Sequence, residues 1–125
     1  MKPPIVFEPL TRTDIVRYAG ASGDFNPIHH DHAFARDSGL PDVMAHGMLS
    51  AGLLASALTR WFGEGSVKRY AVRFKSPVWP GDVLTARCVV VGSSSGELDV
   101  EIGLARASGE VVVSGTARVN GGQES

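Results

Sequence analysis

The chain has 125 residues, of which 43% are hydrophobic and 20% are charged, values typical of one globular domain with a single hydrophobic core over residues 1–125. The formal net charge of −1 provides neither a basic field for nucleic acid nor a polybasic segment for a membrane surface. A lone cysteine, Cys88, cannot form an internal disulfide, and MKPPIVFEPL lacks the form of a signal peptide, so we expect a cytoplasmic protein.

The N-terminal part predicts a short strand followed by a helix. Residues 5–10 have the composition of a strand, although the flanking prolines weaken it. The sequence TRTDIVRYAG follows, with apolar residues at helical spacing and with Thr11 or Thr13 available as the N-cap. Gly20 and Gly23 are expected to end this helix.

An irregular segment is expected next, because Pro27 removes a backbone donor and forces the preceding residue out of the helical region. Residues 22–30, SGDFNPIHH, should therefore form a rigid loop. Asp31 is a suitable N-cap for a short helix over residues 32–38, which Gly39 then ends.

The sequence AHGMLSAGLLASALTRWFG, residues 45–63, predicts the longest helix of the chain. Its small and apolar residues occupy every face as far as Arg60, so we expect a helix surrounded by other elements. A membrane span is not favoured, because the segment contains His46, Thr59 and Arg60 and is followed by amphipathic strand patterns.

The rest of the chain predicts four antiparallel strands, over residues 67–75, 83–91, 97–104 and 111–119. Turn sequences separate them, so each strand is expected to pair with the next, and the strand over residues 5–10 would complete the sheet. Residues 121–125 are expected to form a frayed end. A curved antiparallel sheet wrapped around one long helix is an α+β hotdog fold, and the other side of the sheet is expected to meet a second copy.

Three stretches carry a resemblance to a known family. The first runs from Tyr18 through SGDFNPIHHD to Ala35, the second is AHGMLSAGLL (45–54), and the third is VRFKSPVWPGDVLTA (72–86). Together they resemble the hydratase motif, hotdog helix and following strands of the MaoC-like (R)-specific enoyl-CoA hydratases, over residues 11–119. The resemblance implies a hydro-lyase that reversibly adds water to trans-2-enoyl thioesters of coenzyme A or acyl carrier protein, giving (R)-3-hydroxyacyl thioesters.

This reaction needs a base for water, an acid for the α-carbon and donors for the thioester oxygen. Asp24 and His29 within reach of one water can supply the first two, and the intervening Asn26 and Pro27 would fix their spacing. The resemblance implies that Asp24 and His29 share the catalytic water and that the backbone N–H of Gly47 faces the thioester oxygen. A helix N-terminus suits that contact through its free amides and its dipole. Taken alone, Asp24 could instead end a helix or form an Asx turn.

Five further residues are assigned to the substrate site: Asn26, His46, Met48, Arg73 and Lys75. Asn26 is expected to order the loop without a chemical step of its own. His46 is either a structural histidine at the helix start, which we favour, or a second base. Arg73 and Lys75 are candidates for contacts with phosphates or a carrier protein, the alternative being that they are ordinary solvated side chains.

The run His29-His30-Asp31-His32 invites comparison with a metal site. Adjacent histidines of an extended chain point in different directions, and no HExxH motif or cysteine pair supports a closed site. We therefore expect no metal and no cofactor, with Asp31 as a helix cap and with His30 and His32 exposed.

One position departs from the family pattern. A serine on the hotdog helix supports the catalytic pair in some members, and the equivalent position here is Ala55. Ser50 and Ser56 are nearby, so the residue that supports the pair stays open.

Two alternative functions remain on the same fold. An acyl-thioesterase would direct water at the carbonyl carbon, and the combination of Asp24 with His29 argues against it. The chain could also be the catalytic subunit of a heteromeric 3-hydroxyacyl dehydratase. We therefore expect a homodimer, or a heterodimer with another hotdog subunit.

Overall fold

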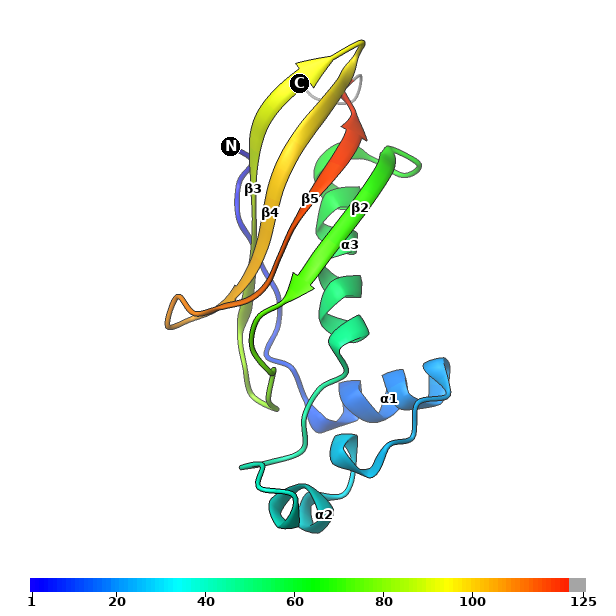
Figure 1. Ribbon diagram of the computed structural model, residues 1–125, viewed down its shortest axis with the longest axis vertical. Helices are drawn as coiled ribbons and strands as arrows, with labels where there is room; N and C mark the ends of the chain where they lie inside the picture. The colour runs from blue at the N-terminus through cyan, green and yellow to red at the C-terminus, as the bar shows by residue number, and fades with distance from the viewer. Residues whose placement is uncertain (122–125) are drawn as a thin grey trace.

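The computed structural model describes residues 1–121, so the expected frayed end, apart from Gly121, lies outside the described residues. The strands form one antiparallel sheet in the order β1-β3-β4-β5-β2, which curves around α3 (Figure 1). The elements in chain order are β1 (Ile5–Val6), α1 (Arg12–Ser22), the 3-10 turn η1 (Pro27–His29), α2 (His32–Asp37), α3 (Gly47–Phe62), β2 (Val67–Phe74), β3 (Leu84–Ser94), β4 (Glu97–Arg106) and β5 (Val111–Asn120).

The hydrophobic core lies between α3 and the inner face of the sheet. The side chains of Leu54, Leu58 and Phe62 on α3 are fully buried there. The same cluster includes Leu84, Cys88, Val100, Leu104, Val113 and Val119 from the strands. Burial of this apolar surface is the main force that holds the helix to the sheet. The predicted α+β packing of a curved sheet around one long helix is confirmed.

The predicted pairing of each strand with the next is wrong for β2. This strand pairs with β5, whereas β3, β4 and β5 form consecutive hairpins. The connection over residues 75–83 therefore crosses the end of the sheet instead of turning back. Arg106 holds this connection, because its guanidinium donates to the carbonyl oxygen of Pro77 at 2.7 Å and to Oδ2 of Asp82 at 2.8 Å.

The predicted helix caps are present on the elements that lead to the loop. Thr11 and Asp14 form a reciprocal capping box at the start of α1. Gly23 ends α1 in the left-handed region with a φ of 77°, so the helix continues past Gly20. Asp31 caps α2 by accepting a hydrogen bond at 3.0 Å from the amide of Phe34.

Two elements, β1 and α3, are shorter in the structure than the sequence predicted. β1 is much shorter than residues 5–10, because Pro9 has no amide to donate, and only the isolated hydrogen bonds from Phe7 and Leu10 to Leu84 and Asp82 continue the pairing. α3 begins at Gly47 instead of residue 45, because His46 has the extended backbone of an N-cap, with a ψ of 138°, and the amide of Ala45 donates to the carbonyl oxygen of Val78 at 2.8 Å.

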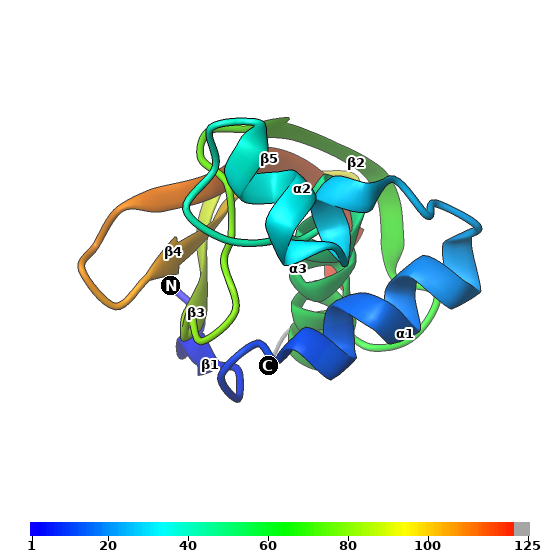
Figure 2. The ribbon, with the colours of Figure 1, turned by 90° about the horizontal axis from the view of Figure 1, so that it is seen from below.

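The prediction that α3 is surrounded is wrong for the isolated chain. Met48, Gly52, Ser56 and Arg60 recur at every fourth position and are exposed, so one stripe of the helix faces solvent. α1 and α2 lie at the N-terminal end of α3 and leave much of its length uncovered (Figures 1 and 2). Within residues 1–121 no helix combines the length and apolar character needed to cross a membrane.

We predict that Gly115→Ala lowers the free energy of unfolding by more than about 2 kcal/mol. A Cβ atom there would lie 2.2 Å from the carbonyl oxygen of Ala71, so β2 and β5 could not keep their spacing. Urea unfolding measures the loss. Gly103→Ala is the matched control, because its Cβ would lie 3.6 Å from the nearest atom, an ordinary contact. Equal losses in the two variants would contradict the close approach of β2 to β5.

Candidate active site

The loop between α1 and α2 is ordered by its own side chains. Asn26 caps η1, because its Oδ1 accepts from the amide of Ile28 at 3.2 Å. Asp24 in turn accepts from the amide of Asn26 at 3.2 Å through Oδ1. Pro27 opens the 3-10 turn that carries His29 at its end. The predicted ordering role of Asn26 is thus present in the structure, and it fixes the backbone between Asp24 and His29.

His29 is anchored so that one ring nitrogen faces Asp24. Its Nδ1 lies 2.5 Å from the carbonyl oxygen of Met44. A carbonyl oxygen can only accept, so Nδ1 carries the hydrogen, and the lone pair of the neutral ring lies on Nε2. Nε2 is 3.7 Å from Oδ2 of Asp24.

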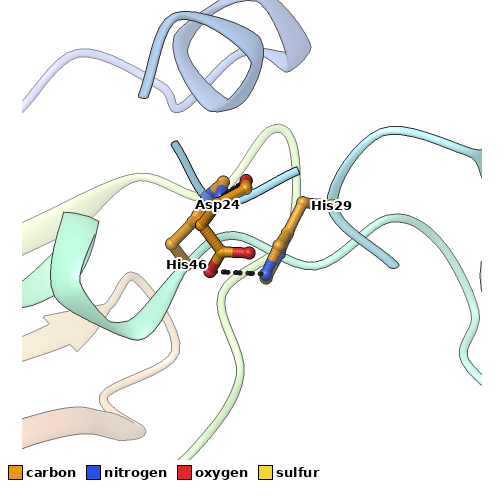
Figure 3. A group of neighbouring side chains, drawn as sticks. All are labelled: Asp24, His29 and His46. Atoms are coloured by element: carbon orange, nitrogen blue, oxygen red, sulfur yellow. Dashed lines mark hydrogen bonds and ion pairs between the residues drawn. The ribbon is translucent and has the colours of Figure 1, made fainter. Parts of the chain in front are cut away.

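The separation of this pair suits a shared water. A distance of 3.7 Å is too long for a direct hydrogen bond, but it lets one water contact both atoms (Figure 3). The side chain of His29 is 8% exposed and that of Asp24 is 53% exposed. The pair is therefore anchored on the histidine side and open on the carboxylate side. The structure brings together the two residues predicted to be catalytic.

His46, which the sequence analysis assigned to the substrate site, joins the same cluster through contacts that the sequence did not predict. Its Nε2 lies 3.0 Å from the backbone oxygen of Asp24, and its ring stacks on that of His29 with the centroids 3.7 Å apart and an interplanar angle of 20°. Tyr18 also packs against the ring of His46, with the centroids 4.9 Å apart and the rings tilted by 57°. The position of His46 directly before the helix gave no indication of these contacts.

The cluster has donor atoms of the type that bind metals, but its geometry is unfavourable for one ion. Ligand atoms of Asp24, His29 and His46 lie within 4.8 Å of one another. The two rings are stacked almost parallel, however, so their in-plane lone pairs cannot both point at a metal about 2 Å from each nitrogen. Within the described residues the arrangement fits a water between carboxylate and imidazole better than a metal.

Gly47 lies at the start of α3, and it also lines a cavity. Its amide is the first of the helix and has no acceptor one turn earlier. A Cβ atom at this position would lie 3.3 Å from the ring of Phe74, so glycine leaves room for this close contact. The adjoining cavity of about 290 Å³ is lined in part by Gly47, Ser50, Phe74 and Lys75.

The structure places the remaining predicted substrate residues in different parts of the surface. Met48 is 62% exposed one position into α3, and Lys75 lines the cavity beside Gly47. Arg73 does not line that cavity but a depression on the sheet, together with Glu101 and Thr116, and Lys75 lines both. Ser56 is exposed and donates to the carbonyl oxygen of Leu53 within α3, while Ser50 is buried and lines the cavity.

Asp42 ties the helices of the loop region together. It accepts from Arg12 of α1 at 2.8 Å, from His32 of α2 at 3.1 Å and from the amide of Val43 at 2.7 Å. Burial acts to raise the pKa of Asp42, but these hydrogen bonds outweigh it and leave that pKa below its ordinary value of 3.8. His32 is thus an exposed partner of Asp42, and it lies outside the His29 cluster, in agreement with the sequence prediction.

Comparison with known proteins shows which family the chain resembles. The family model described as "MaoC like domain" matches residues 4–110. The (R)-specific enoyl-CoA hydratase of Rhodospirillum rubrum is 35% identical over 113 residues, which cover 88% of this chain and 78% of that protein. Some other curated relatives are much longer, and the match covers only 5% of the fatty acid synthase beta subunit TOXC of Cochliobolus carbonum.

Solved structures show the same fold. The (R)-hydratase of Aeromonas caviae, described as involved in PHA biosynthesis, matches with a TM-score of 0.87 and 28% identity over 96% of this chain and 93% of that one. The ChsH1-ChsH2 complex of Mycobacterium tuberculosis matches with a TM-score of 0.84 and 25% identity, over 94% of this chain and 92% of that one.

The fold and these likenesses define an enzyme of the hotdog hydratase and dehydratase class. Because the family model covers most of its length, the chain belongs to the MaoC-like domain family, as the sequence motifs predicted.

We predict that Asp42→Asn lowers the thermal midpoint at pH 7 by about 2–5 °C. The folded-state pKa of Asp42 is lowered, so its stabilising contribution is present above the unfolded-state pKa and is lost as the pH falls through the folded-state pKa. Melting curves for the variant and the parent should therefore converge as the pH falls from 7 to below the folded-state pKa of Asp42. Asp37→Asn, an exposed carboxylate on α2, is the control and should show no comparable pH dependence. A difference that persists at the acid end would contradict the prediction.

Proposed function

We propose that this enzyme reversibly adds water to trans-2-enoyl thioesters, of coenzyme A or acyl carrier protein, to form (R)-3-hydroxyacyl thioesters. The observation that carries the proposal is the 3.7 Å separation of Asp24 Oδ2 and His29 Nε2, on a pair that is open on one side. The names of relatives support it, since the Rhodospirillum rubrum protein is called an (R)-specific enoyl-CoA hydratase. The (R) configuration is taken from that likeness.

In the proposed mechanism the pair holds one water between carboxylate and imidazole. His29 Nε2 takes one proton from this water as its oxygen bonds to C3 of the enoyl group, while Asp24 accepts a hydrogen bond from the O–H that stays on the oxygen. The electron pair of the double bond moves toward the thioester oxygen, which the amide of Gly47 stabilises. The proton held by the pair then goes to C2, so the water is added in full and no other reactant is needed. The reverse sequence removes water.

A second copy of the chain is the proposed partner. The exposed stripe of α3, made by Met48, Gly52 and Ser56, contains no charged residue before Arg60 and leaves an apolar side chain in solvent. Small residues allow another backbone to approach such a face closely. The match to a structure described as the ChsH1-ChsH2 complex keeps a heterodimer with another hotdog subunit as the alternative.

We predict that Asp24→Asn and His29→Ala each lower kcat/KM with crotonyl-CoA by at least about 100-fold, the usual scale for loss of a positioned acid or base. Loss of enoyl-thioester absorbance measures hydration, and a longer trans-2-enoyl-CoA tests chain length in parallel. Asp37→Asn and His32→Ala are the controls, because both residues lie on α2 outside the cluster, and they should stay within about threefold of the parent.

Three results would count against the proposal. Undiminished activity in both Asp24→Asn and His29→Ala would remove the shared-water assignment. Release of free thiol from a saturated acyl-CoA, without hydration, would favour the acyl-thioesterase. Activity that requires an added hotdog subunit would replace the homodimer with a heterodimer.

For the second copy, we predict that Gly52→Arg shifts the protein from dimer to monomer in sedimentation at about 10 μM. The added side chain meets open space in the isolated chain, and arginine favours a helix over glycine, so the fold should be retained. Gly20→Arg on α1 is the matched control, because it is also helical, exposed and without a nearby atom. A dimer that persists in Gly52→Arg would show that the stripe is not the interface.

A further inference from the structure

His46 makes contacts that a helix cap does not require. It occupies the N-cap position of α3 but offers no side-chain hydrogen bond to the helix amides. The residue is only 3% exposed, and its Nδ1 is buried without a hydrogen-bond partner in the part of the chain that the structure describes. Burial of an unpaired ring nitrogen is unfavourable, so a structural role as a cap does not account for this placement.

The ring of His46 is joined to both members of the proposed catalytic pair. Its Nε2 donates to the backbone oxygen of Asp24 at 3.0 Å across 22 positions of sequence. Its face stacks on the ring of His29 at 3.7 Å. One side chain at the start of α3 therefore contacts the backbone that carries the carboxylate and the ring that carries the imidazole nitrogen.

The hydrogen bond from His46 joins Asp24 to a distant part of the chain. The other hydrogen bonds of Asp24 are local, from its amide to Oγ of Ser22 at 3.2 Å and from the amide of Asn26 to its Oδ1 at 3.2 Å. Local bonds shape the loop but do not fix where it lies relative to the core. The bond from His46 Nε2 does so, because α3 is part of the core.

We infer that His46 is a positioning residue, which sets the separation between Asp24 and His29 through these two contacts. The inference rests on the proposed hydration of enoyl thioesters. His46 does not act as a base itself, because Nε2 already donates to a carbonyl and Nδ1 is buried. The rings that contact His46 are those of Tyr18 and His29, and the backbone oxygen of Asp24 accepts from its Nε2.

Two substitutions separate the contacts of His46. His46→Phe keeps a ring that can stack on His29 but has no donor for the carbonyl oxygen of Asp24. His46→Gln keeps an N–H donor of similar reach. We expect His46→Phe to lower kcat with crotonyl-CoA about 10- to 100-fold while KM stays within about threefold, because small displacements of reacting groups cost rate more than binding. We expect His46→Gln to regain at least about fivefold in kcat.

A double substitution tests whether His46 acts through Asp24. In the Asp24→Asn background, His46→Phe should lower the remaining activity by less than about twofold, because the group that it positions is already absent. A general loss of folding would instead lower activity by the same factor in both backgrounds. Equal losses in the two backgrounds would overturn the inference and leave the shared-water proposal intact.

Hydrogen exchange provides a readout that does not depend on activity. Loss of the donor in His46→Phe should speed amide exchange in residues 23–28, with less change in His46→Gln, while β4 and β5 stay protected. Unchanged exchange in the loop, or a kcat equal to the parent in His46→Phe, would overturn the positioning role. If the parent protein did not hydrate enoyl thioesters, the proposed function would fail, and the exchange result would still decide whether His46 holds the loop.

Discussion

The extended residues directly before α3 hold the site to the core. The amide of Met44 donates to the carbonyl oxygen of Ile28 at 2.9 Å, and its carbonyl oxygen accepts from His29 Nδ1. The amide of Ala45 donates to the carbonyl oxygen of Val78 at 2.8 Å, in the connection that crosses the sheet. The loop, the crossover and the long helix therefore meet over adjacent residues. Because these are backbone groups, the tautomer and direction of the His29 ring follow from the fold.

The features that could be predicted from sequence are mainly those whose causes are local. A capping residue acts on amides two or three positions away, so Thr11 and Asp31 indicated the helices that follow them. The restrictions of Pro27 act on its neighbours, so an ordered turn between Asp24 and His29 was also predictable. Local causes therefore predicted the ordered turn between Asp24 and His29 and the capping role of Asn26, whereas the catalytic roles of Asp24, His29 and the Gly47 amide came from the family resemblance and stay predictions.

Features that depend on distant parts of the chain were not predictable in the same way. The turn residues of 75–83 suggest a hairpin, and only the pairing of β2 with β5 shows a crossover. Gly115 was a signal for this pairing, since a glycine inside a strand of β-branched residues often marks the close approach of another backbone. For His46 no comparable signal exists, because its contacts reach back across 22 positions to a loop whose placement the sequence does not give.

Exposed apolar side chains beside the site relate the proposed hydration to the proposed second copy of the chain. Three large apolar side chains are half exposed or more beside it, Phe25 at 62%, Met48 at 62% and Phe74 at 50%. Phe25 follows Asp24 in the chain, Met48 follows Gly47, and Phe74 contacts the Gly47 position. Stabilisation of a developing negative charge by an amide is stronger where water is excluded, and the isolated chain leaves this rim in solvent. Substrate and a second subunit that cover these side chains would bury apolar surface and exclude water from the site at the same time. Assembly and catalysis would then depend on one another.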